Sequence, residues 1–531
     1  MDAGLISAVL LMGMLFLLAI GMPLAFASGV LAVAVMAMKF GVGMLFSHFG
    51  MGPLNILAQR IYGVLTNYAL ISVPLFIFMA LMLERSGIAK DMYSSLNMWL
   101  SRTRGGIAIV TSIMAIVMAA MSGIIGGEVV LLGLIALPQM LRLGYNQSLA
   151  IGTICASGTL GTMIPPSIVL IMYGLVTETS IHSLFKAAFF PGFMLGGFYI
   201  IYIIIRTRLN PSLAPLPEMD EEQLAGLEKT KCFFTLLGWM VAVWGAGRLV
   251  HGGAIEIQNA FGGLRPEEYL PYSMQDHLLS LGALLIGWLG TRFAFGQTIV
   301  AETWRMSKGL VAPFIIVGVV LGSIYGGITG ITEAAGMGSI IVLIIVAVRR
   351  ELTFKLIKQA ASQTFVSTGS ILSITMGATA LAGAYTMAGG PTYIANLIIG
   401  ADMPTYGVLL IMMVIFLFLG AFMDWVGIVL LVMPVFLPII VELPRAELGL
   451  LGPMVDHAAL VPIWFGVVFT VAMQVAFLSP PFGPAAFFLK SVAPPHITLP
   501  DIFKGFIPFI GIQVLVLLLV LFFPELTMVF L

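Results

Sequence analysis

The chain is poor in charged residues, cysteine and histidine. Only 9% of its 531 residues are charged, and 24 basic residues balance 24 acidic ones. Two cysteines, Cys155 and Cys232, make no disulfide framework, and six scattered histidines make no zinc-binding spacing. Nucleophile elbows and phosphate-binding loops are also missing. We therefore expect no enzyme activity, no covalent cofactor and no nucleic-acid partner.

Hydrophobic residues make up 60% of the chain, and its mean hydropathy is +1.09. About a dozen apolar runs approach or exceed the roughly 20 residues that a spanning helix needs. The composition predicts an all-α polytopic membrane protein. The first run, Gly4–Met38, is too long for a signal-peptide core and has no basic residue ahead of it, so we expect it in the mature protein. Simple spans are expected at Gly4–Ile20, Met22–Met38, Asn67–Leu83, Leu184–Ile205, Leu310–Ile328, Ile331–Val348, Phe365–Ala388 and Phe506–Phe523.

One pattern occurs twice. Glu128 lies ten residues before Pro138, and Asp424 lies ten residues before Pro434, each inside an apolar segment of about 36 residues. These segments, 106–141 and 406–441, are too long for one helix and short for two spans with a loop. We interpret them as re-entrant hairpins; two tightly packed spans joined by a glycine turn are the alternative.

Basic residues predict the orientation through the positive-inside rule. If the N-terminus lies outside and both long segments are hairpins, 18 of the 24 Lys and Arg residues face the cytoplasm. Full crossing by either segment would move every later loop to the other side and remove this bias. We expect the first hairpin to open inward and the second outward. The six basic residues left outside are Lys39, Arg60, Lys186, Arg248, Arg265 and Arg445.

Each hairpin is followed by a segment that a proline pair interrupts, over 149–176 and 460–489. Proline removes a backbone donor and breaks the helix, which leaves carbonyl oxygens free near Gly161 and Thr162. Carbonyls and hydroxyls are hard ligands suited to Na⁺, although a kink that serves packing alone is the alternative. The candidate residues are Ser157, Gly158, Thr159, Gly161, Thr162 and Pro165 in the first segment and Gln474, Ser479, Pro480 and Gly483 in the second.

Carboxylates at membrane depth are functional candidates, because an unpaired charge there is costly. Glu128 and Asp424 either ligate an ion or substrate, or cap the helix that follows each hairpin turn. Glu333, after Thr332, lies at another helix start, where a capping role is expected.

The chain is predicted to consist of two inverted repeats, 1–211 and 306–531, on either side of an insertion, 212–305. Paired, interrupted segments in two halves are typical of the binding sites of secondary transporters. The insertion is expected to contain two further spans, Phe233–Val250 and His277–Leu289, and polar loops at Arg206–Lys231 and His251–Asp276.

Several motifs together resemble the large membrane subunit, of the DctM type, of tripartite ATP-independent periplasmic (TRAP) transporters. The resemblance covers nearly everything except about 212–305. The motifs are Met121–Gly123, Ala136–Leu141, Gly144–Tyr145, Ala156–Gly161, Ile164–Ser167, Pro191–Gly192, Arg206–Pro211, Thr332–Ala335, Phe422–Asp424, Ser479–Pro481 and Leu499–Gly505.

The resemblance implies an elevator-type permease in a bacterial inner membrane, with a periplasmic N-terminus. A small four-span membrane subunit, expected as a separate chain, and a periplasmic binding protein would be its partners. The implied function is Na⁺-coupled import of an organic acid, a C4-dicarboxylate or a 2-oxo or hydroxy acid. Extra spans such as those predicted in the insertion resemble the longer subfamily associated with 2-oxo, hydroxy and aromatic acids.

The resemblance also implies where Na⁺ and substrate bind. The first hairpin tip, at Ser122, Gly123, Gly126 and Gly127, would face Ser157–Thr162, and the second, Gly420–Asp424, would face Gln474–Gly483. Na⁺ would bind to carbonyls and hydroxyls near Ser122, Gly161, Asp424 and Ser479. This chain departs from many relatives by having Ile124 and Ile125 in place of a serine-rich first tip, followed by Glu128. The alternatives are a stand-alone Na⁺/dicarboxylate symporter of the divalent-anion type, a channel, or an intramembrane enzyme.

Overall fold

The chain is almost entirely helical. The computed structural model describes residues 2–43, 52–100, 103–216, 227–261, 274–399, 403–421, 423–443, 445–448, 457–481 and 483–531, and within these ranges every regular element is a helix. Eight of the described helices are long and apolar enough to cross a membrane. The prediction of an all-α polytopic membrane protein is confirmed. These helices are Tyr68–Arg85, Ile181–Leu209, Glu228–Leu249, Phe295–Tyr325, Ile331–Val348, Phe354–Ala388, Ala459–Leu478 and Leu499–Phe522.

Two units make up the chain. The larger comprises Met1–Lys90, Arg102–Leu216 and Ala312–Leu531, and the smaller comprises Asp91–Ser101 and Pro217–Val311. The larger unit begins with α1 (Ala3–Ala19), α2 (Leu24–Phe40), α4 (Pro53–Leu65), η1 (Tyr68–Ile71), α5 (Ser72–Arg85), α7 (Gly106–Ser122), α8 (Gly126–Arg142), α9 (Gln147–Gly158), η2 (Leu160–Thr162), α10 (Ile168–Thr177), α11 (Ile181–Leu209) and η3 (Pro211–Leu213).

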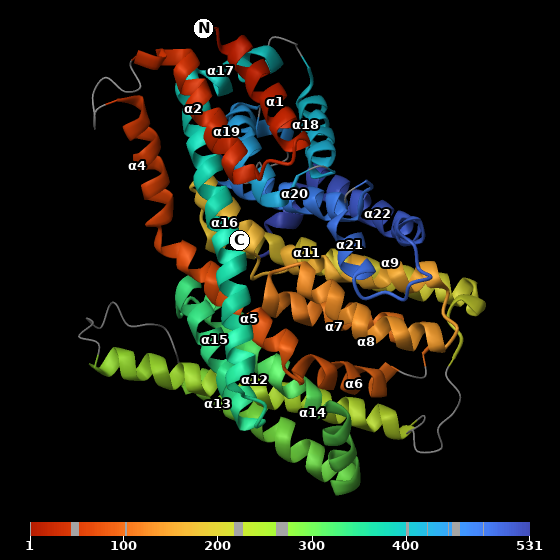
Figure 1. Cartoon of the computed structure of the whole chain (residues 1–531). Coiled ribbons are helices and arrows are strands. Elements are labelled where there is room, and N and C mark those ends of the chain that lie inside the picture. The colour runs from red at the N-terminus through yellow and green to blue at the C-terminus, as the bar shows by residue number, and fades with distance from the viewer. Residues whose placement is uncertain are drawn as a thin grey trace. The chain divides into compact units, whose positions relative to one another are not determined.

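The second half of the larger unit starts within α14. Its elements are α14 (Thr291–Tyr325), α15 (Ile331–Val348), α16 (Phe354–Ala388), α17 (Gly390–Ile399), α18 (Thr405–Gly420), α19 (Trp425–Glu442), η6 (Arg445–Leu448), α20 (His457–Leu478), α21 (Pro484–Lys490), α22 (Leu499–Phe522) and η7 (Pro524–Thr527). In Figure 1, α2 lies along α16, and α7 lies beside α8; both pairs are in contact.

Close packing in the larger unit depends on small residues. At Gly152 in α9, an added Cβ would lie 2.5 Å from Phe509 of α22, so glycine lets these two helices approach closely. At Gly466 in α20, an added Cβ would lie 2.6 Å from Tyr173 of α10, which therefore packs directly on the α20 backbone. Because lipid supplies no hydrophobic drive between helices, such close approach is a main source of their association.

The smaller unit contains α6 (Ile88–Leu100) from Asp91 onward, α12 (Leu227–Phe261), α13 (Met274–Leu285), a π-helical turn (Ile286–Gly290) and the first part of α14. An ion pair of 2.8 Å between Arg248 and Asp276 joins α12 to α13. The Ser95 hydroxyl accepts a hydrogen bond of 3.1 Å from the Gly309 backbone and joins α6 to α14.

The structure changes parts of the prediction for the insertion. The loop expected over 251–276 is helical as far as Phe261, because α12 continues there; positions 262–273 lie outside the described residues. The loop expected over 206–231 is helical up to Leu209, contains the 3₁₀ turn η3 and is helical again from Leu227; 217–226 lie outside the described residues. The first extra span, predicted over 233–250, lies within the candidate Glu228–Leu249 except for its last residue. The second, 277–289, lies in α13 and the π-helical turn, which are not among the eight candidates.

Helix starts are another difference. The span predicted from Phe365 begins at Phe354, because the Thr353 hydroxyl caps the Leu356 backbone N–H and the helix extends past its apolar part. Likewise α22 begins at Leu499, before the predicted Phe506, with a capping box between Thr498 and Asp501. The sequence analysis also missed α4 and α17.

Candidate functional site

The first predicted hairpin is a helix–turn–helix. The turn begins at Gly123, whose φ of 67° is left-handed and suits glycine. An added Cβ on Gly123 would lie 2.6 Å from the carbonyl oxygen of Pro166, so the turn packs against the break between η2 and α10. The backbone of the first turn therefore directly contacts the backbone of the first broken segment.

Glu128 lies in the first turn of α8 and is 3% exposed. Its Oε1 accepts a hydrogen bond from the Ser122 hydroxyl, which ties the two ends of the turn together. Its Oε2 is buried without a hydrogen-bond partner among the described residues. An added Cβ on Gly161 would lie 2.8 Å from Oε1 and 2.9 Å from the Ile124 carbonyl oxygen, so Gly161 leaves the space that the carboxylate occupies.

The first broken segment lies over 159–167. After α9, a short 3₁₀ turn leads to a cis peptide bond between Pro165 and Pro166. The sequence predicted a free carbonyl at Thr162, but the Ser167 hydroxyl reaches back and donates to it. Ser167 also caps α10 through the Leu170 backbone N–H. The carbonyl of Thr162 is therefore already partnered.

Gln474 connects the two halves of the chain. Its amide Nε2 donates to the Thr159 carbonyl (2.9 Å) and to the Thr162 hydroxyl (2.7 Å). Its Oε1 is buried and has no partner among the described residues. Behind Thr159, the hydroxyls of Ser157 and Ser112 are 2.9 Å apart and hydrogen-bonded. Gln474 thus cross-links α20 to the first broken segment through two polar groups.

The second predicted hairpin also turns between two helices. Asp424 is the N-cap of α19, and its Oδ1 accepts a hydrogen bond of 2.9 Å from the Trp425 N–H. An added Cβ on Gly420, at the end of α18, would overlap Ala476 of α20, so α18 and α20 approach closely there. The motif residue Phe422 lies outside the described residues.

The second broken segment separates α20 from α21. Pro480–Pro481 is a cis peptide bond, as in the first half. The Ser479 hydroxyl donates to the Val475 carbonyl at 2.7 Å, and the Gly483 N–H donates to the Ser479 carbonyl at 3.0 Å. Phe482 lies outside the described residues.

A cavity of about 160 Å³ is the place where these elements meet. Both turns line it, and so do parts of both broken segments and of α5 and α16. The lining residues are Ile77, Gly123, Ile124, Ile125, Gly126, Thr162, Ile168, Ser367, Ile371, Asp424, Trp425, Phe477, Pro484 and Phe488. Asp424 is the only ionisable residue in that set. We call this space the tip cavity.

A second cavity of about 440 Å³ shares five lining residues with the tip cavity: Ile77, Ile124, Gly126, Ser367 and Phe488. It also reaches Glu128 and the Glu84–Arg85 end of α5. The Glu84 carboxylate lies directly against the Gly127 backbone. The lining of this second cavity therefore contains two acidic groups, Glu84 of α5 and Glu128 of α8, and one basic group, Arg85 of α5.

Not every predicted site residue lies at these cavities. Glu333 does not cap its helix with its side chain; Gly330 is the N-cap, and the Glu333 carboxylate accepts a hydrogen bond of 2.9 Å from Tyr68. The Thr332 hydroxyl donates to the Tyr68 carbonyl at 3.3 Å. Both residues join α15 to η1. Gly158 packs on Val129 of α8. The tip cavity is also not lined by four predicted residues that lie in the two broken segments: Pro165, Ser479, Pro480 and Gly483.

Sequence reasoning did not name Trp425, Phe477 or Phe488 as site residues, although all three line the tip cavity and Phe477 lies within the predicted stretch Gln474–Gly483. Trp425 follows the predicted Asp424 directly, and Phe477 lies two residues before Ser479, so their positions beside the motifs were the available signal. Phe488 carries no such signal, because only the folding of α21 against α8 brings it there.

The fold and the arrangement of the site indicate the class of protein. The described helices form a polytopic membrane protein whose two interrupted segments and two helical turns meet at one cavity. A crystal structure of the Alcanivorax borkumensis YdaH transporter, described as having an unusual topology, has a similar fold: the TM-score is 0.50 and the identity 14%, and the match covers 94% of this chain and 98% of that one. The chain thus shares its overall fold with that protein.

The family follows from the sequence comparison. Residues 11–526 match the model of the tripartite ATP-independent periplasmic transporter, DctM component, and the chain belongs to this family. Members of the family are transport proteins rather than enzymes, as the sequence analysis expected.

Relatives carry related names. The C4-dicarboxylate TRAP transporter large permease protein DctM of Pseudomonas aeruginosa is 34% identical over 31% of this chain and 39% of its own length. The isethionate TRAP transporter permease protein DctMQ of Oleidesulfovibrio alaskensis is 23% identical over 97% of this chain and 64% of its own length. The ectoine/5-hydroxyectoine permease UehC of Ruegeria pomeroyi is 23% identical over 98% of both chains. The chain thus spans less than two thirds of the first two relatives.

Proposed function

We propose that this chain is the permease subunit of a Na⁺-coupled tripartite transporter that imports an organic acid. A separate small membrane subunit and a periplasmic binding protein are its partners, and a bacterial inner membrane is its location, with the N-terminus in the periplasm. The tip cavity carries the proposal, because residues from both turns and both broken segments converge there.

Two buried oxygens beside the tip cavity support a cation there, although neither of their residues lines it. Glu128 lines the adjoining second cavity, and Gln474 donates to the lining residue Thr162. Glu128 Oε2 and Gln474 Oε1 are acceptors without donors among the described residues. A buried acceptor without a partner is costly, and a bound cation removes that cost. Na⁺ prefers such oxygen ligands, and carbonyls and hydroxyls near Ser122, Gly161, Asp424 and Ser479 would complete its coordination.

The charge of the tip cavity supports coupling between Na⁺ and an anionic substrate. Its described lining contains no Lys or Arg, so a carboxylate substrate finds countercharge only from helix N-termini, hydroxyls and bound Na⁺. The three relatives are permeases for C4-dicarboxylates, isethionate and ectoine or 5-hydroxyectoine. We propose a C4-dicarboxylate or a 2-oxo or hydroxy acid as the substrate class.

An elevator motion is the mechanism that we propose for this import. Na⁺ would order the two turns, and the substrate would then bind between them. The stand-alone symporter is the alternative. It differs in needing no binding protein, and genes for a binding protein and a four-span subunit beside this one would count against it.

Uptake into proteoliposomes tests the proposal. The chain is reconstituted with its cognate small subunit, and uptake of a labelled dicarboxylate and a labelled 2-oxo acid is measured with and without binding protein and an inward Na⁺ gradient. The proposal expects uptake only when both are present. Uptake with Na⁺ alone would replace it by the stand-alone symporter, and non-saturating leak indifferent to both would replace it by a channel.

A further inference from the structure

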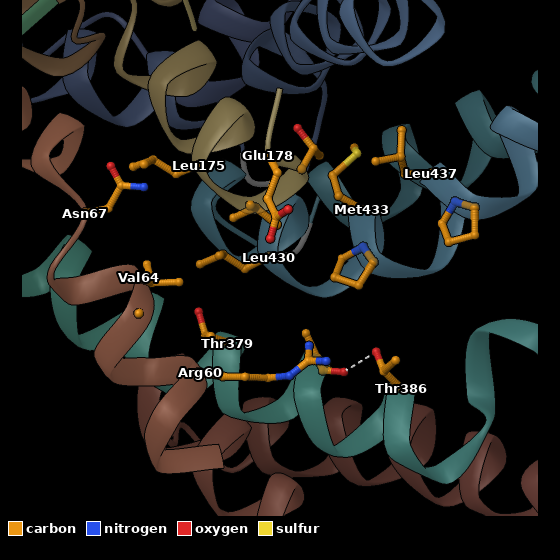
Figure 2. Close-up of a pocket in the computed structure, with 16 residues that line it drawn as sticks. Arg60, Val64, Asn67, Leu175, Glu178, Thr379, Thr386, Leu430, Met433 and Leu437 are labelled. Carbon is orange, nitrogen blue, oxygen red and sulfur yellow. Dashed lines mark hydrogen bonds between the residues drawn. The ribbon is translucent and has the colours of Figure 1, made fainter. Parts of the chain in front are cut away.

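A large cavity in the described part of the larger unit lies away from both turns. It has a volume of about 720 Å³ and is formed by α4, the end of α10, α16 and α19. Figure 2 shows its lining side chains. None of its lining residues lines the tip cavity, so the proposed function leaves it without a role. We call it the Arg60 cavity.

The packing of the Arg60 side chain depends on a glycine in the neighbouring helix α16. An added Cβ on Gly383 of α16 would lie 2.8 Å from Arg60 Cδ, so this glycine lets the arginine stem lie flat on the helix. In Figure 2 the side chain extends along α16 toward Thr386. Among the described residues, none forms a hydrogen bond or ion pair with its guanidinium. A guanidinium in this state is a strong binding group for a carboxylate, which it holds through two parallel hydrogen bonds.

Glu178 brings a negative charge to the same cavity. It is the C-cap of α10, with φ 54° and ψ 30°, a left-handed conformation in which glycine is the usual residue. In Figure 2 its side chain points into the cavity, and no described residue hydrogen-bonds to its carboxylate. A side chain kept in an unfavourable backbone conformation indicates a use for that side chain.

Further groups complete the cavity. Asn67 Oδ1 accepts from the Ala69 N–H at 3.0 Å, which leaves the Asn67 amide N–H groups as donors. The Thr386 hydroxyl donates to the Ala382 carbonyl at 2.7 Å, so its oxygen remains an acceptor. Leu430 and Met433 of α19 provide an apolar wall. The lining thus combines one positive charge, one negative charge, neutral polar groups and an apolar surface.

We propose that the Arg60 cavity is an access site for an organic monocarboxylate that also carries a hydrogen-bond donor, either a hydroxyl or an ammonium group. Its carboxylate pairs with Arg60, its donor group binds Glu178, and its carbon skeleton lies on the α19 wall. A C4-dicarboxylate fits less well, because its second carboxylate would lie near Glu178, and like charges repel. This inference rests on the proposed function and narrows its substrate class.

The sequence assigns the Arg60 cavity a side of the membrane. Arg60 is one of only six basic residues predicted outside, against the general bias of the chain. An outside location is where an incoming solute first meets the permease. Binding here would then precede transfer to the tip cavity, so loss of Arg60 should raise KM while leaving the maximal rate of uptake nearly unchanged.

Equilibrium binding to the full chain with its cognate small subunit in lipid nanodiscs tests the inference. The probes are lactate, alanine, pyruvate and succinate, which separate a hydroxyl donor, an ammonium donor, no donor and a second carboxylate. We expect saturable binding of lactate or alanine at least tenfold tighter than that of pyruvate and succinate; whichever binds identifies the donor. Binding of none of the four, or tightest binding of succinate, overturns the inference.

Variants separate the two charges. Arg60→Gln should weaken binding of the preferred probe about tenfold or more, because a charged hydrogen bond is lost. Glu178→Gln should weaken the preferred probe and strengthen succinate, because the cavity becomes net positive. Lys186→Gln is the matched control. Lys186 is a basic residue predicted on the same side of the membrane, and it does not line the Arg60 cavity. Equal binding by Arg60→Gln and Lys186→Gln overturns the inference.

A stability measurement isolates the role of the Glu178 carboxylate. Glu178→Gly removes the left-handed strain, so its melting temperature should rise while its affinity for the preferred probe falls. Wild-type affinity in a stabilised Glu178→Gly protein would show that the carboxylate binds nothing. The proposed function has its own test: it is wrong if the wild-type complex shows no Na⁺-dependent uptake. The inference alone is wrong if the wild type transports but the Arg60 and Glu178 variants bind the preferred probe with wild-type affinity.

Discussion

Gly161→Ala tests whether the contact between the first turn and the first broken segment matters for transport. The added Cβ would lie 2.8 and 2.9 Å from the two carboxylate oxygens of Glu128 and 2.9 Å from the Ile124 carbonyl oxygen. All three approaches are closer than real Cβ contacts allow, so the turn must move. Overpacking of this kind typically costs about 1–3 kcal/mol.

The same displacement should weaken cation binding. If the turn holds Na⁺ and the cost falls on the Na⁺-bound state, about 1–3 kcal/mol corresponds to a rise of roughly 5- to 150-fold in the Na⁺ concentration for half-maximal uptake. Gly197→Ala on α11 is the control, because an added Cβ there meets nothing within 4 Å. It should leave uptake unchanged and raise stability slightly.

Thermal unfolding and Na⁺-dependent uptake are measured on both variants. Glu128→Ala combined with Gly161→Ala should be less destabilising than the sum of the single changes, because the first removes the carboxylate that the second pushes against. Additive effects would show that the two residues do not interact. Unchanged Na⁺ dependence in Gly161→Ala would refute the role of this contact in cation binding.

Three further predictions concern single residues. Asp424→Ala should sharply reduce uptake with normal expression, and wild-type transport would contradict its role as ligand or essential cap, since a lost N-cap alone costs about 1 kcal/mol. Gln474→Leu removes both hydrogen bonds to the first broken segment and leaves the Thr159 carbonyl without that donor, so unfolding should occur at a lower temperature; a transition at the wild-type temperature would contradict this. The pKa of the Glu351 carboxyl lies below its usual range, because the Arg349 side chain and the Gly87 N–H both donate hydrogen bonds to it. The contribution of ionised Glu351 to folding stability is therefore fully present above about pH 4.5 and is lost as pH falls through the lowered pKa. The difference in melting temperature between wild type and Glu351→Gln should shrink below that pH, and a difference that grows would contradict the sign.

The sequence predicts the elements whose signals are local. The bounds of α15 agree with the predicted span to the residue, because a long apolar run ends at Gly330 and at Arg349. The two turns and the two proline-pair breaks were also located, because glycine and proline act on their own backbone. In contrast, α4 was missed, because Asn55, Gln59 and Arg60 interrupt its hydrophobic pattern.

The contacts of the candidate site could not be predicted in the same way. Gln474 was singled out, but its bonds to Thr159 and Thr162 join residues more than 300 positions apart. The close packing of the Arg60 side chain on Gly383 could not be predicted from the local sequence either, since both residues lie in ordinary helices. Glu333 shows the opposite error: its position at a helix start suggested a cap, while tertiary packing gave its carboxylate to Tyr68. Interactions between distant segments decide these roles.

The charges around the tip cavity give a physical reason for obligatory coupling. Asp424 is the only ionisable side chain in its described lining, and it carries the same sign as the proposed substrate. An anion bound beside it in a low-dielectric space would be repelled, and helix dipoles supply only about half a charge each. Bound Na⁺ would reverse that balance, so substrate without Na⁺ should bind poorly. Substrate affinity measured at the tip cavity should therefore rise with Na⁺ concentration in the wild type. It should depend less on Na⁺ in Asp424→Asn, where the repulsion is removed; an equal dependence would show that Na⁺ acts on the substrate by another route.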